Sequence, residues 1–287
     1  MVNGTATFSN FYLGCCIINK MNNDKYVLLT GANGGIGKQI LIHLLEAGYK
    51  VISLDINNNN ILDLDTTFIK CDVTNSTDII DAYEIVKKLT NELYAIVNTI
   101  GIFMMESIIE GKTEDFERIF NVNFFGVYKL NKAMFPLLRK GSRIINLTSE
   151  VARYSPQPFQ AYYNLTKITL DKYTDVLRRE CNYLGIKVIK VQSGSMNTTM
   201  LKSADQEFNE MVKESEHFKK PLVKLKYMMD RELKKTNNPK IMGKLIVKIL
   251  NKKHPKIKYR VKNSFALSFI GHLPEKWQDK IYQKVIK

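Results

Sequence analysis

Short apolar runs alternate with stretches of helical periodicity along most of the chain. Seven β-branched runs predict strands near Tyr26–Thr30, Val51–Leu54, Phe68–Ile69, Ala95–Asn98, Arg143–Leu147, Lys187–Gln192 and Lys258–Val261. Helical periodicity predicts helices at Ser76–Leu89, Thr113–Phe135, Gln160–Tyr183 and Pro239–Ile249. This alternation is what a parallel sheet covered by helices on both faces requires. We therefore expect a three-layer α/β/α fold with about seven strands.

Neither an internal repeat nor a long linker divides this pattern. We expect residues 1–20 to be a poorly ordered N-terminal extension and residues 21–287 to form one domain. Residues 196–235 are charged, contain several methionines and lack a strand signal. Since ligands gather at the carboxyl ends of parallel strands, this segment is predicted to be a substrate lid.

Charge is unevenly distributed along the chain. The net charge is +15, and residues 201–287 carry 22 basic and 9 acidic side chains, so the first 200 residues are almost neutral. Two interpretations are open: a surface that contacts an anionic membrane or an acidic partner, and a solvated lysine-rich face. The basic C-terminal segment, residues 255–287, mixes apolar side chains and a single Trp277 with lysines. Because no basic motif with interleaved aromatic residues occurs, we expect no nucleic-acid partner.

The cysteines and the apolar runs limit the compartment. Cys15, Cys16, Cys71 and Cys181 have neither metal-ligand spacing nor the density of a disulfide framework, which predicts no metal site and a reducing environment. No run of 18 apolar residues occurs, and residues 1–20 make a poor secretory signal. We expect a cytoplasmic protein, with peripheral membrane contact as an open alternative.

A glycine-rich turn follows the first predicted strand. Thr30-Gly31-Ala32-Asn33-Gly34-Gly35-Ile36-Gly37 runs directly into a helix. Glycines at 31, 35 and 37 permit a tight turn and the close approach of a pyrophosphate to the backbone, while the helix N-terminus favours the anion. A glycine-rich strand-to-helix turn without a ligand is the alternative. The pattern predicts a dinucleotide site.

An acidic residue at the end of the second strand bears on the choice of dinucleotide. Asp55 stands 18 residues after Gly37, where a carboxylate can accept hydrogen bonds from ribose hydroxyls and repel a 2′-phosphate. No lysine or arginine precedes Gly35 in the turn. These features predict NAD rather than NADP, although Asp55 also fits a turn acid before the Asn57–Asn60 run.

Tyr163 and Lys167 are four residues apart in a segment with helical periodicity. Their side chains therefore lie on one helix face. An ammonium group about 4 Å from a phenolate lowers the phenol pKa from about 10 and makes tyrosine a useful acid and base. An ordinary amphipathic helix face is the alternative. The pair predicts general acid/base chemistry.

Five motifs together resemble the short-chain dehydrogenase/reductase family of the single-domain type. They are the glycine turn, Cys71-Asp72-Val73, Val97-Asn98-Thr99-Ile100-Gly101, Asn121-Val122-Asn123 with Gly126, and Leu147-Thr148-Ser149 ahead of Tyr163 and Lys167. The resemblance covers residues 25–199 and implies a Rossmann-type doubly wound sheet. It also implies a nicotinamide-dependent oxidoreductase that forms a homodimer or homotetramer.

The resemblance assigns roles to individual positions. Asn123, Ser149, Tyr163 and Lys167 would be catalytic. Gly31, Asn33, Gly35, Ile36, Gly37, Asp55, Asp72, Val73, Asn98, Gly101, Tyr163, Lys167, Gly194 and Thr198 would bind the cofactor. Asp72, Asn98 and Gly101 also fit turn or capping residues. Ser149 also fits a strand-end cap, and Asn123 a buried amide that braces a helix kink.

Three departures from the family pattern affect these assignments. Ser149 precedes Tyr163 by 14 residues, one more than usual, and Glu150 fills the extra place. Tyr162 has the usual distance from Ser149, but only Tyr163 has the spacing to Lys167. Ser193-Gly194 replaces the Pro-Gly after the sixth strand, and Thr99-Ile100 replaces an Ala-containing turn.

The segments around Tyr163 are similar to those of the steroid and retinoid subgroup. Arg153–Phe159, Leu177–Glu180 and Tyr183–Ile186 carry this similarity. It implies a small apolar alcohol or carbonyl substrate, with core packing as the alternative role for the apolar side chains at 103–105, 196, 200, 228 and 229. A non-catalytic dinucleotide sensor or scaffold of the same fold is the alternative function.

Overall fold

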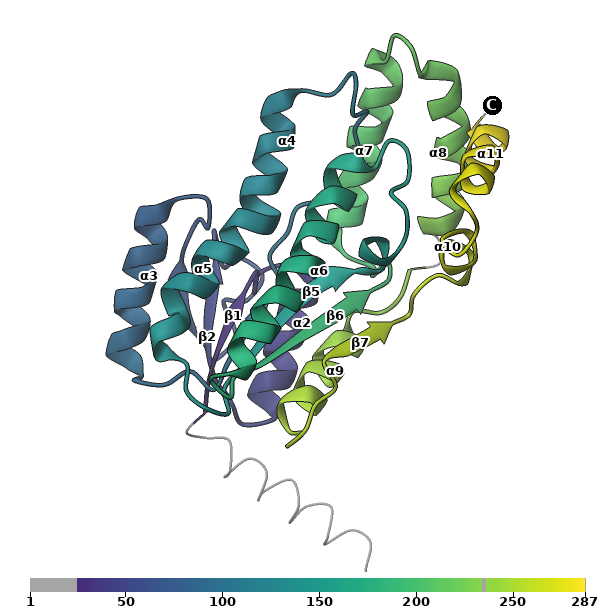
Figure 1. Ribbon diagram of the computed structural model, residues 1–287. Coiled ribbons are helices and arrows are strands. Elements are labelled where there is room, and N and C mark those ends of the chain that lie inside the picture. Colours follow the sequence, from purple (N-terminus) through teal and green to yellow (C-terminus); the bar gives the residue numbers. More distant parts are fainter. Residues whose placement is uncertain (1–24, 234–235, 287) are drawn as a thin grey trace, which may run out of the picture.

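The computed structural model describes residues 25–233 and 236–286, and its centre is a seven-stranded sheet. The strands are β1 Tyr26–Thr30, β2 Lys50–Asp55, β3 Thr67–Lys70, β4 Ala95–Asn98, β5 Arg143–Ser149, β6 Lys187–Ser193 and β7 Lys258–Val261. Their order is β3-β2-β1-β4-β5-β6-β7, and every neighbouring pair is parallel. The predicted doubly wound parallel sheet is confirmed (Figure 1).

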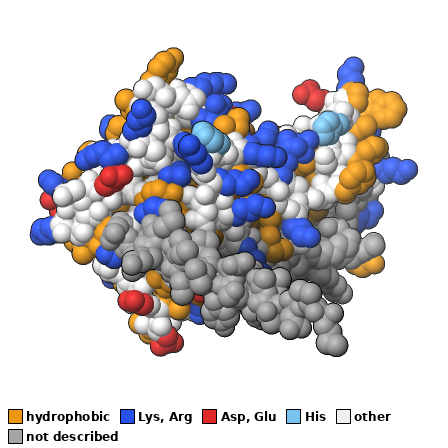
Figure 2. Space-filling model, turned by 90° about the horizontal axis from the view of Figure 1, so that it is seen from below, with side chains coloured by type: hydrophobic (Ala, Val, Ile, Leu, Met, Phe, Trp, Pro, Cys, Tyr) orange, Lys and Arg blue, Asp and Glu red, His pale blue; other side chains and the backbone are white. Residues whose placement is uncertain are grey.

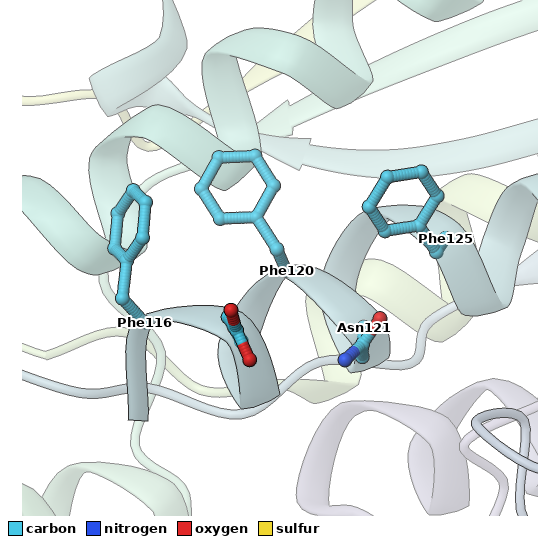
Figure 3. Close-up of a pocket in the computed structure, with 5 residues that line it drawn as sticks. Phe116, Phe120, Asn121 and Phe125 are labelled. Carbon is cyan, nitrogen blue, oxygen red and sulfur yellow. The ribbon is translucent and has the colours of Figure 1, made fainter. Parts of the chain in front are cut away.

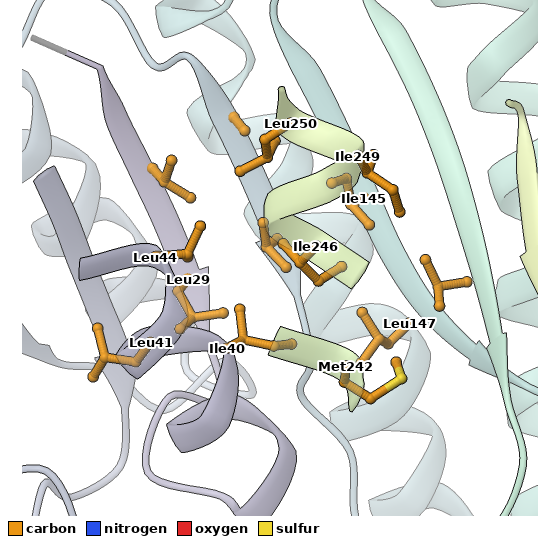
Figure 4. Packing of buried hydrophobic residues seen from close by; sticks show 14 of the residues in the cluster. Leu29, Ile40, Leu41, Leu44, Ile145, Leu147, Met242, Ile246, Ile249 and Leu250 are labelled. Atoms are coloured by element: carbon orange, nitrogen blue, oxygen red, sulfur yellow. The ribbon is translucent and has the colours of Figure 1, made fainter. Parts of the chain in front are cut away.

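Helices cover both faces of this sheet. They are α2 Gly35–Glu46, α3 Ser76–Leu89, α4 Thr113–Phe120, α5 Val127–Met134, α6 Ala161–Asn182, α7 Thr199–Glu214, α8 Lys219–Leu233, α9 Lys240–Leu250, α10 Phe265–Ile270 and α11 Glu275–Ile286. Helices α2 and α9 pack on one face with an apolar cluster that includes Ile40, Leu44, Met242 and Ile246 (Figure 4). Helices α3, α5 and α6 bury a second cluster on the other face.

One predicted helix is broken in the structure. The segment expected as one helix from Thr113 to Phe135 consists of α4, a π-helical segment η1 at Asn121–Gly126, α5 and a short 3₁₀ segment η2 at Phe135–Leu137. A π segment widens the turn by one residue and is frequent at functional sites. Apolar periodicity did not show it, because the same face stays buried on both sides of the break.

The expected lid region folds into two helices. Within residues 196–235, the structure describes α7 and α8, which contact each other above the carboxyl ends of the strands (Figure 1). The predicted extension at residues 1–20 lies outside the described residues. The boundaries of the domain and of the lid as functional units stay predictions. Within the described ranges, no helix has both the length and the apolar character needed to cross a bilayer.

Candidate active site

The glycine turn between β1 and α2 is held by backbone sterics. Gly31 has φ +70°, and a Cβ atom there would lie 2.8 Å from Oγ1 of Thr99. A Cβ atom on Gly37 would lie 1.9 Å from the carbonyl oxygen of Gly31. No other residue type fits at Gly37 without moving backbone. The turn therefore has the close-packed form that the sequence pattern predicts, and Ile36 lies in the first turn of α2.

Asp55 lies beside this turn at the end of β2. Its two carboxylate oxygens accept backbone N–H groups from Asn33, at 2.9 Å, and from Ile56, at 2.8 Å. Burial raises the pKa of Asp55, against these hydrogen bonds. The side chain of Asn33 itself bonds Asn57 at 2.5 Å and the Asn60 N–H at 2.8 Å. The Asn57 N–H also donates to this carboxylate, so three backbone N–H groups hold Asp55 at the turn.

Two other predicted cofactor positions have structural partners. Oδ1 of exposed Asp72 accepts the N–H of Thr74 at 2.9 Å and its hydroxyl at 2.7 Å, while Val73 is buried. The Asn98 amide is buried and donates to Asn131 and Asn146 at 2.9 and 2.8 Å. Asp72 thus stabilises a turn, and Asn98 is part of a buried hydrogen-bond network. Contact of either residue with a dinucleotide stays a prediction.

The catalytic positions on α6 converge with the end of β5. The Ser149 side chain is hydrogen-bonded to Tyr163, and Nζ of Lys167 lies 5.6 Å from the centre of the Tyr163 ring. The ring of Phe103 lies 4.8 Å from that of Tyr163. The residues between Ser149 and Tyr163 begin with the 3₁₀ segment η3, Glu150–Arg153. The structure therefore brings Ser149, Tyr163 and Lys167 together as the resemblance implies.

Tyr162 has a different environment from Tyr163. Its hydroxyl donates to the carbonyl oxygen of Lys112 at 3.0 Å, and its ring packs on Phe116 with centroids 4.9 Å apart. Only 2% of Tyr162 is exposed. A hydroxyl committed to a backbone carbonyl in the core is poorly placed for proton transfer. This geometry favours Tyr163 as the acid/base residue.

The protonation of the pair differs from the expected one. We expected Lys167 to lower the pKa of Tyr163, but burial raises that pKa to about 12, with the hydrogen bond from Ser149 acting against it and the charge of Glu150 adding to it. Burial also lowers the pKa of Lys167 to about 8. For both residues, removal of the charged form from water is the largest cause of the pKa shift. At neutral pH both groups hold their protons.

Asn123 lies in the π segment and fixes the loop after β4. Its Oδ1 accepts the N–H of Ile102 at 2.8 Å, and its Nδ2 donates to the Ile102 carbonyl at 2.9 Å and to Thr166 at 3.1 Å. A Cβ atom on Gly101 would lie 2.9 Å from Nζ of Lys167 and 3.3 Å from Oδ1 of Asn123. Gly101 thus lets Asn123 and Lys167 approach each other. A proton path through Asn123 stays a prediction.

The segment after β6 closes the other side of the site. A Cβ atom on Gly35 would lie 2.7 Å from the Thr198 methyl group, so Thr198 packs against the glycine turn. Gly194 follows β6 and donates its N–H to Val261 at 2.8 Å. Thr198 and Gly194 therefore lie at the same edge of the sheet as the turn, at the carboxyl ends of the strands. The resemblance puts the nicotinamide there.

A buried polar network joins α6 to strands β5 and β6. The sequence analysis did not predict it. Nζ of Lys190 on β6 bonds Asp171 at 2.5 Å and Asp175 at 2.8 Å. Asp171 also accepts from Thr148 at 3.2 Å and Gln192 at 2.9 Å. Asp171 lies one helical turn beyond Lys167, and Thr148 precedes Ser149. The network therefore ties the catalytic face of α6 to the strand ends.

A period-two signal was available for this network. Asn146 and Thr148 on β5, and Lys190 and Gln192 on β6, are polar at alternate positions, and alternate residues of a strand share one face. Acidic residues at Asp171 and Asp175, one turn apart on α6, are their counterparts. Buried polar groups are paired with each other, so such a pattern predicts a network.

The lid helices contribute an apolar cluster next to the site. Met105, Phe208, Met211 and Leu222 are buried together, and Phe103, which touches Tyr163, packs against them. Met196, by contrast, lies in the core cluster around α2 and α9, and Met200 is exposed. The side chains of Met228 and Met229 are outside the described part. Met105 and Met196 are therefore packed in apolar clusters, which is the alternative role, and an apolar substrate pocket stays a prediction.

A separate small cavity of about 280 Å³ opens on α4 and η1. Phe116, Glu117, Phe120, Asn121 and Phe125 line it (Figure 3). None of the predicted catalytic or cofactor residues is among them. Within the described residues, no group of three or more His, Cys, Asp or Glu side chains could hold a metal ion.

Several curated proteins have similar sequences. The chain is 31% identical over 184 residues to the NADPH-dependent 1-acyldihydroxyacetone phosphate reductase of Schizosaccharomyces pombe, covering 62% of both chains. It is 27% identical to the 3-ketodihydrosphingosine reductase of Bacteroides thetaiotaomicron, covering 82% of this chain and 87% of that protein. It is 32% identical to 17-beta-hydroxysteroid dehydrogenase type 6 of Bos taurus, covering 67% of this chain and 62% of that protein.

A solved structure and a family profile complete the comparison. The ligand-free aldohexose dehydrogenase of Thermoplasma acidophilum superimposes with a TM-score of 0.71 at 20% identity, covering 90% of this chain and 98% of that one, which shows a shared fold. The profile of the short chain dehydrogenase family matches residues 25–209, which include the glycine turn and the Tyr163 and Lys167 pair. The chain belongs to the short chain dehydrogenase family.

Proposed function

We propose that this protein is a nicotinamide-dependent oxidoreductase that interconverts an alcohol and a carbonyl compound. The observation that carries this proposal is the position of the acid/base pair one loop away from the glycine turn. Thr99 contacts Gly31 of the turn, and Gly101, two residues later, contacts Lys167. Proton transfer and dinucleotide binding would therefore take place side by side.

Each residue of the site has a role in this reaction. When bound, the nicotinamide cofactor supplies the hydride that is exchanged with the substrate carbon. Ser149 donates a hydrogen bond to the substrate oxygen, and Tyr163 gives or takes the proton at that oxygen. Lys167 holds a positive charge beside the phenol and stabilises its ionised form. Asn123 keeps the loop over Lys167 in place through Ile102.

The test pairs two neighbouring tyrosines. Purified protein is mixed with NADH or NADPH and a panel of ketones and aldehydes, and turnover is followed by absorbance. Tyr163→Phe should lose turnover by at least about 100-fold, the scale of general acid catalysis, while cofactor binding is kept. Tyr162→Phe, the matched control, removes a hydroxyl bonded only to a backbone carbonyl. Full activity of Tyr163→Phe would refute the proposal, and cofactor binding without any turnover would favour the sensor or scaffold alternative.

We propose NAD as the preferred cofactor over NADP. Asp55 supports this, because its carboxylate lies beside the turn and would repel a 2′-phosphate. One relative is named as NADPH-dependent, which makes the test necessary. Asp55→Ala should move the ratio of the two dissociation constants toward NADP by about tenfold, and exposed Asp63→Ala should leave it unchanged. An unchanged ratio in Asp55→Ala would contradict this assignment.

We propose a small apolar substrate of the steroid, retinoid or lipid class. The apolar cluster of α7 and α8 supports it, because Phe103 joins that cluster to Tyr163. Three relatives are named for 1-acyldihydroxyacetone phosphate, 3-ketodihydrosphingosine and a 17-beta-hydroxysteroid. A panel of such compounds beside short polar alcohols tests this class. Higher kcat/KM for the polar alcohols would overturn it.

We also propose contact between the basic C-terminal third and an anionic membrane surface. Phe265, Phe269 and Trp277 of α10 and α11 are 85%, 59% and 63% exposed. Figure 2 shows hydrophobic side chains near basic ones at the right-hand edge, the side where Figure 1 places these helices. Aromatic residues among lysines suit a lipid interface. Salt-sensitive binding to vesicles with anionic lipid, absent with neutral lipid, is expected.

Two further proposals follow from the resemblance. We propose a homodimer or homotetramer, which sedimentation of the purified protein would test. Exposed Phe125 and Tyr128 on η1 and α5 give apolar surface for such an assembly. We propose a cytoplasmic location, on the grounds of the free thiols of buried Cys71 and Cys181. A secreted, disulfide-bonded product would contradict it.

A further inference from the structure

Glu150 is a buried carboxylate that follows Ser149 in the chain, and its charge acts on the Tyr163 phenol. It is the first residue of η3, and only 7% of its surface is exposed. It is also the residue that lengthens the Ser149 to Tyr163 spacing by one. Burial of a carboxylate is unfavourable unless hydrogen bonds or opposite charges compensate. We therefore expect hydrogen bonds or charges that compensate the burial of the Glu150 carboxylate.

The contacts of Glu150 join four segments. Oε2 accepts the backbone N–H of Ser264, the residue that caps α10. Oε1 lies next to Gly194, where a Cβ atom would be 3.2 Å away from it and 2.1 Å from the Lys262 carbonyl oxygen. The Gly194 N–H in turn donates to Val261. The ends of β5, β6 and β7 thus meet at Glu150, and α10 begins on it.

The turn that leads into α10 has little other support. Lys262 has φ +54°, a left-handed conformation that is strained for a residue with a Cβ atom. The amide of Asn263 has both polar atoms buried without a hydrogen-bond partner in the described part. Helix α10 has no buried residue. The hydrogen bond from Ser264 to Glu150 is therefore a main constraint on this turn.

The C-terminal helices connect this turn to the lid. A Cβ atom on Gly271, directly after α10, would lie 2.5 Å from the ring of Tyr154, so this end of α10 packs against the residue after η3. Helix α11 packs on lid helix α8 (Figure 1). A path of contacts therefore runs from the turn of Ser149 through Glu150 and α10 to α11 and the lid.

We propose that Glu150 is a positioning residue for the reaction, whose carboxylate joins the turn that carries Ser149 to the start of α10. The placement of the C-terminal helices and of the acid/base pair then depends on one side chain. This inference rests on the proposed function, because it takes Tyr163 and Lys167 as the acid/base pair. It assigns to Glu150 a role that the family resemblance does not supply.

The charge of Glu150 has a separate, measurable consequence. The groups that act on or contact Tyr163 are the hydrogen-bonded Ser149 hydroxyl from β5, the charge of Glu150 from η3, the Lys167 ammonium from α6 and the uncharged ring of Phe103. A negative charge nearby disfavours phenolate. Removing that charge therefore moves the ionisation of Tyr163 to lower pH.

The first experiment separates charge from shape. Glu150→Gln keeps an acceptor oxygen for the Ser264 N–H and removes the charge. The pH at which kcat changes with ionisation of Tyr163 should fall by about half a unit or more. The exposed Glu84→Gln on α3 is the matched control and should match the unmodified protein. A pH profile of Glu150→Gln that superimposes on the control refutes an effect of the Glu150 charge on Tyr163, and the hydrogen bond to Ser264 is then judged by the second experiment.

The second experiment removes the hydrogen bond from the other partner. Ser264 has φ −67°, which proline adopts without strain, so Ser264→Pro deletes the N–H donor. Ser264→Ala deletes the capping hydroxyl and keeps the N–H. Ser264→Pro should speed amide exchange within 265–270 and lower kcat about fivefold relative to Ser264→Ala, with cofactor affinity unchanged. Equal exchange and kcat in the two variants would refute the coupling.

These measurements distinguish the inference from the proposed function. Amide exchange in α10 does not depend on turnover and can be followed in Glu150→Ala as well. If Tyr163→Phe keeps its activity, the proposed function fails, whatever the exchange data show. If Tyr163→Phe is inactive but exchange and pH profile do not respond to residues 150 and 264, only the role of Glu150 fails.

Discussion

The glycine turn and the C-terminal helices lie on two sides of the candidate site and are held in different ways. At the turn, Gly31 and Gly37 are packed against backbone atoms, and the residues of β1 beside them are fully buried. Helix α10 has no buried residue, and its start is held by a hydrogen bond to Glu150. The glycine turn is thus defined by backbone packing, and the start of α10 by a few side-chain contacts.

This difference has a functional meaning within one family fold. A dinucleotide is the same in every relative that uses it, so its site tolerates rigid backbone sterics. Substrates differ among relatives, and a region held by side-chain contacts changes with few substitutions. The charge follows the same division, since residues 201–287 carry nearly all of the net positive charge.

The largest change in unfolding free energy should come from the buried network that joins Lys190 to Asp171 and Asp175. Lys190→Met leaves Asp171 and Asp175 without their buried cation, and breaking such a pair costs about 3–5 kcal/mol of unfolding free energy. Lys226→Met is the control in the C-terminal third, where the partly exposed pair with Asp205 is worth about 0–1 kcal/mol. Urea unfolding at pH 7 measures both. Equal losses of unfolding free energy in Lys190→Met and Lys226→Met would contradict the difference between the core and the C-terminal third.

The same variant has a defined pH dependence. Burial alone would raise the pKa of Asp175, but the bond to Lys190 and the charges of Lys190, Arg178 and Lys172 hold it below its ordinary value. The contribution of this carboxylate to stability is therefore present above about pH 4 and is lost as pH falls through the lowered pKa. The difference between Lys190→Met and the unmodified protein should shrink below about pH 4.

Lys167→Met should stabilise the protein while abolishing turnover. Burial lowers the pKa of Lys167 from 10.5 to about 8, so holding its charge at pH 7 costs roughly 3 kcal/mol. Between these two pKa values the unfolded chain binds more protons, and the stability of the unmodified protein rises with pH. The advantage of Lys167→Met in urea unfolding should therefore be largest at pH 7 and nearly absent near pH 10.5. A variant less stable at pH 7 would contradict this reasoning.

Gly37→Ala tests the rigidity of the turn. The added methyl group would meet the Gly31 carbonyl oxygen at 1.9 Å, and overpacking of this kind costs about 1–3 kcal/mol. Dinucleotide affinity should fall with it. Gly34→Ala is the control in the same turn, because its Cβ atom would lie 3.3 Å from that oxygen. Calorimetric titration and urea unfolding check both variants, and equal behaviour would remove the steric argument.

The smallest stability effect is expected at the C-terminal surface. Trp277→Ala removes a side chain that is 63% exposed and should change the unfolding free energy by less than about 0.5 kcal/mol. Binding to anionic vesicles should weaken about threefold or more, since the ring would be lost from the lipid interface. Vesicle sedimentation checks this, and unchanged binding would argue against membrane contact through α11.

Sequence patterns predicted the sheet well and the polar interior poorly. Each predicted strand differs from the observed one by at most two residues at either end, because short β-branched runs bounded by turn residues are a local signal. The break at η1 was missed, since a π turn changes backbone bonding without changing which face is apolar. The Lys190 network was missed because its members come from β5, β6 and α6.

By itself, the sequence determined the order of the strands and helices, the glycine turn and the spacing of Tyr163 from Lys167. These features depend on neighbours in the chain and on helical or strand periodicity. Only the tertiary structure decided that the Tyr162 hydroxyl donates to the Lys112 carbonyl and that burial shifts the pKa values of Tyr163 and Lys167. It also decided that Glu150 accepts the Ser264 N–H at the start of α10. Those outcomes depend on desolvation and on contacts between segments far apart in the chain, which no local pattern records.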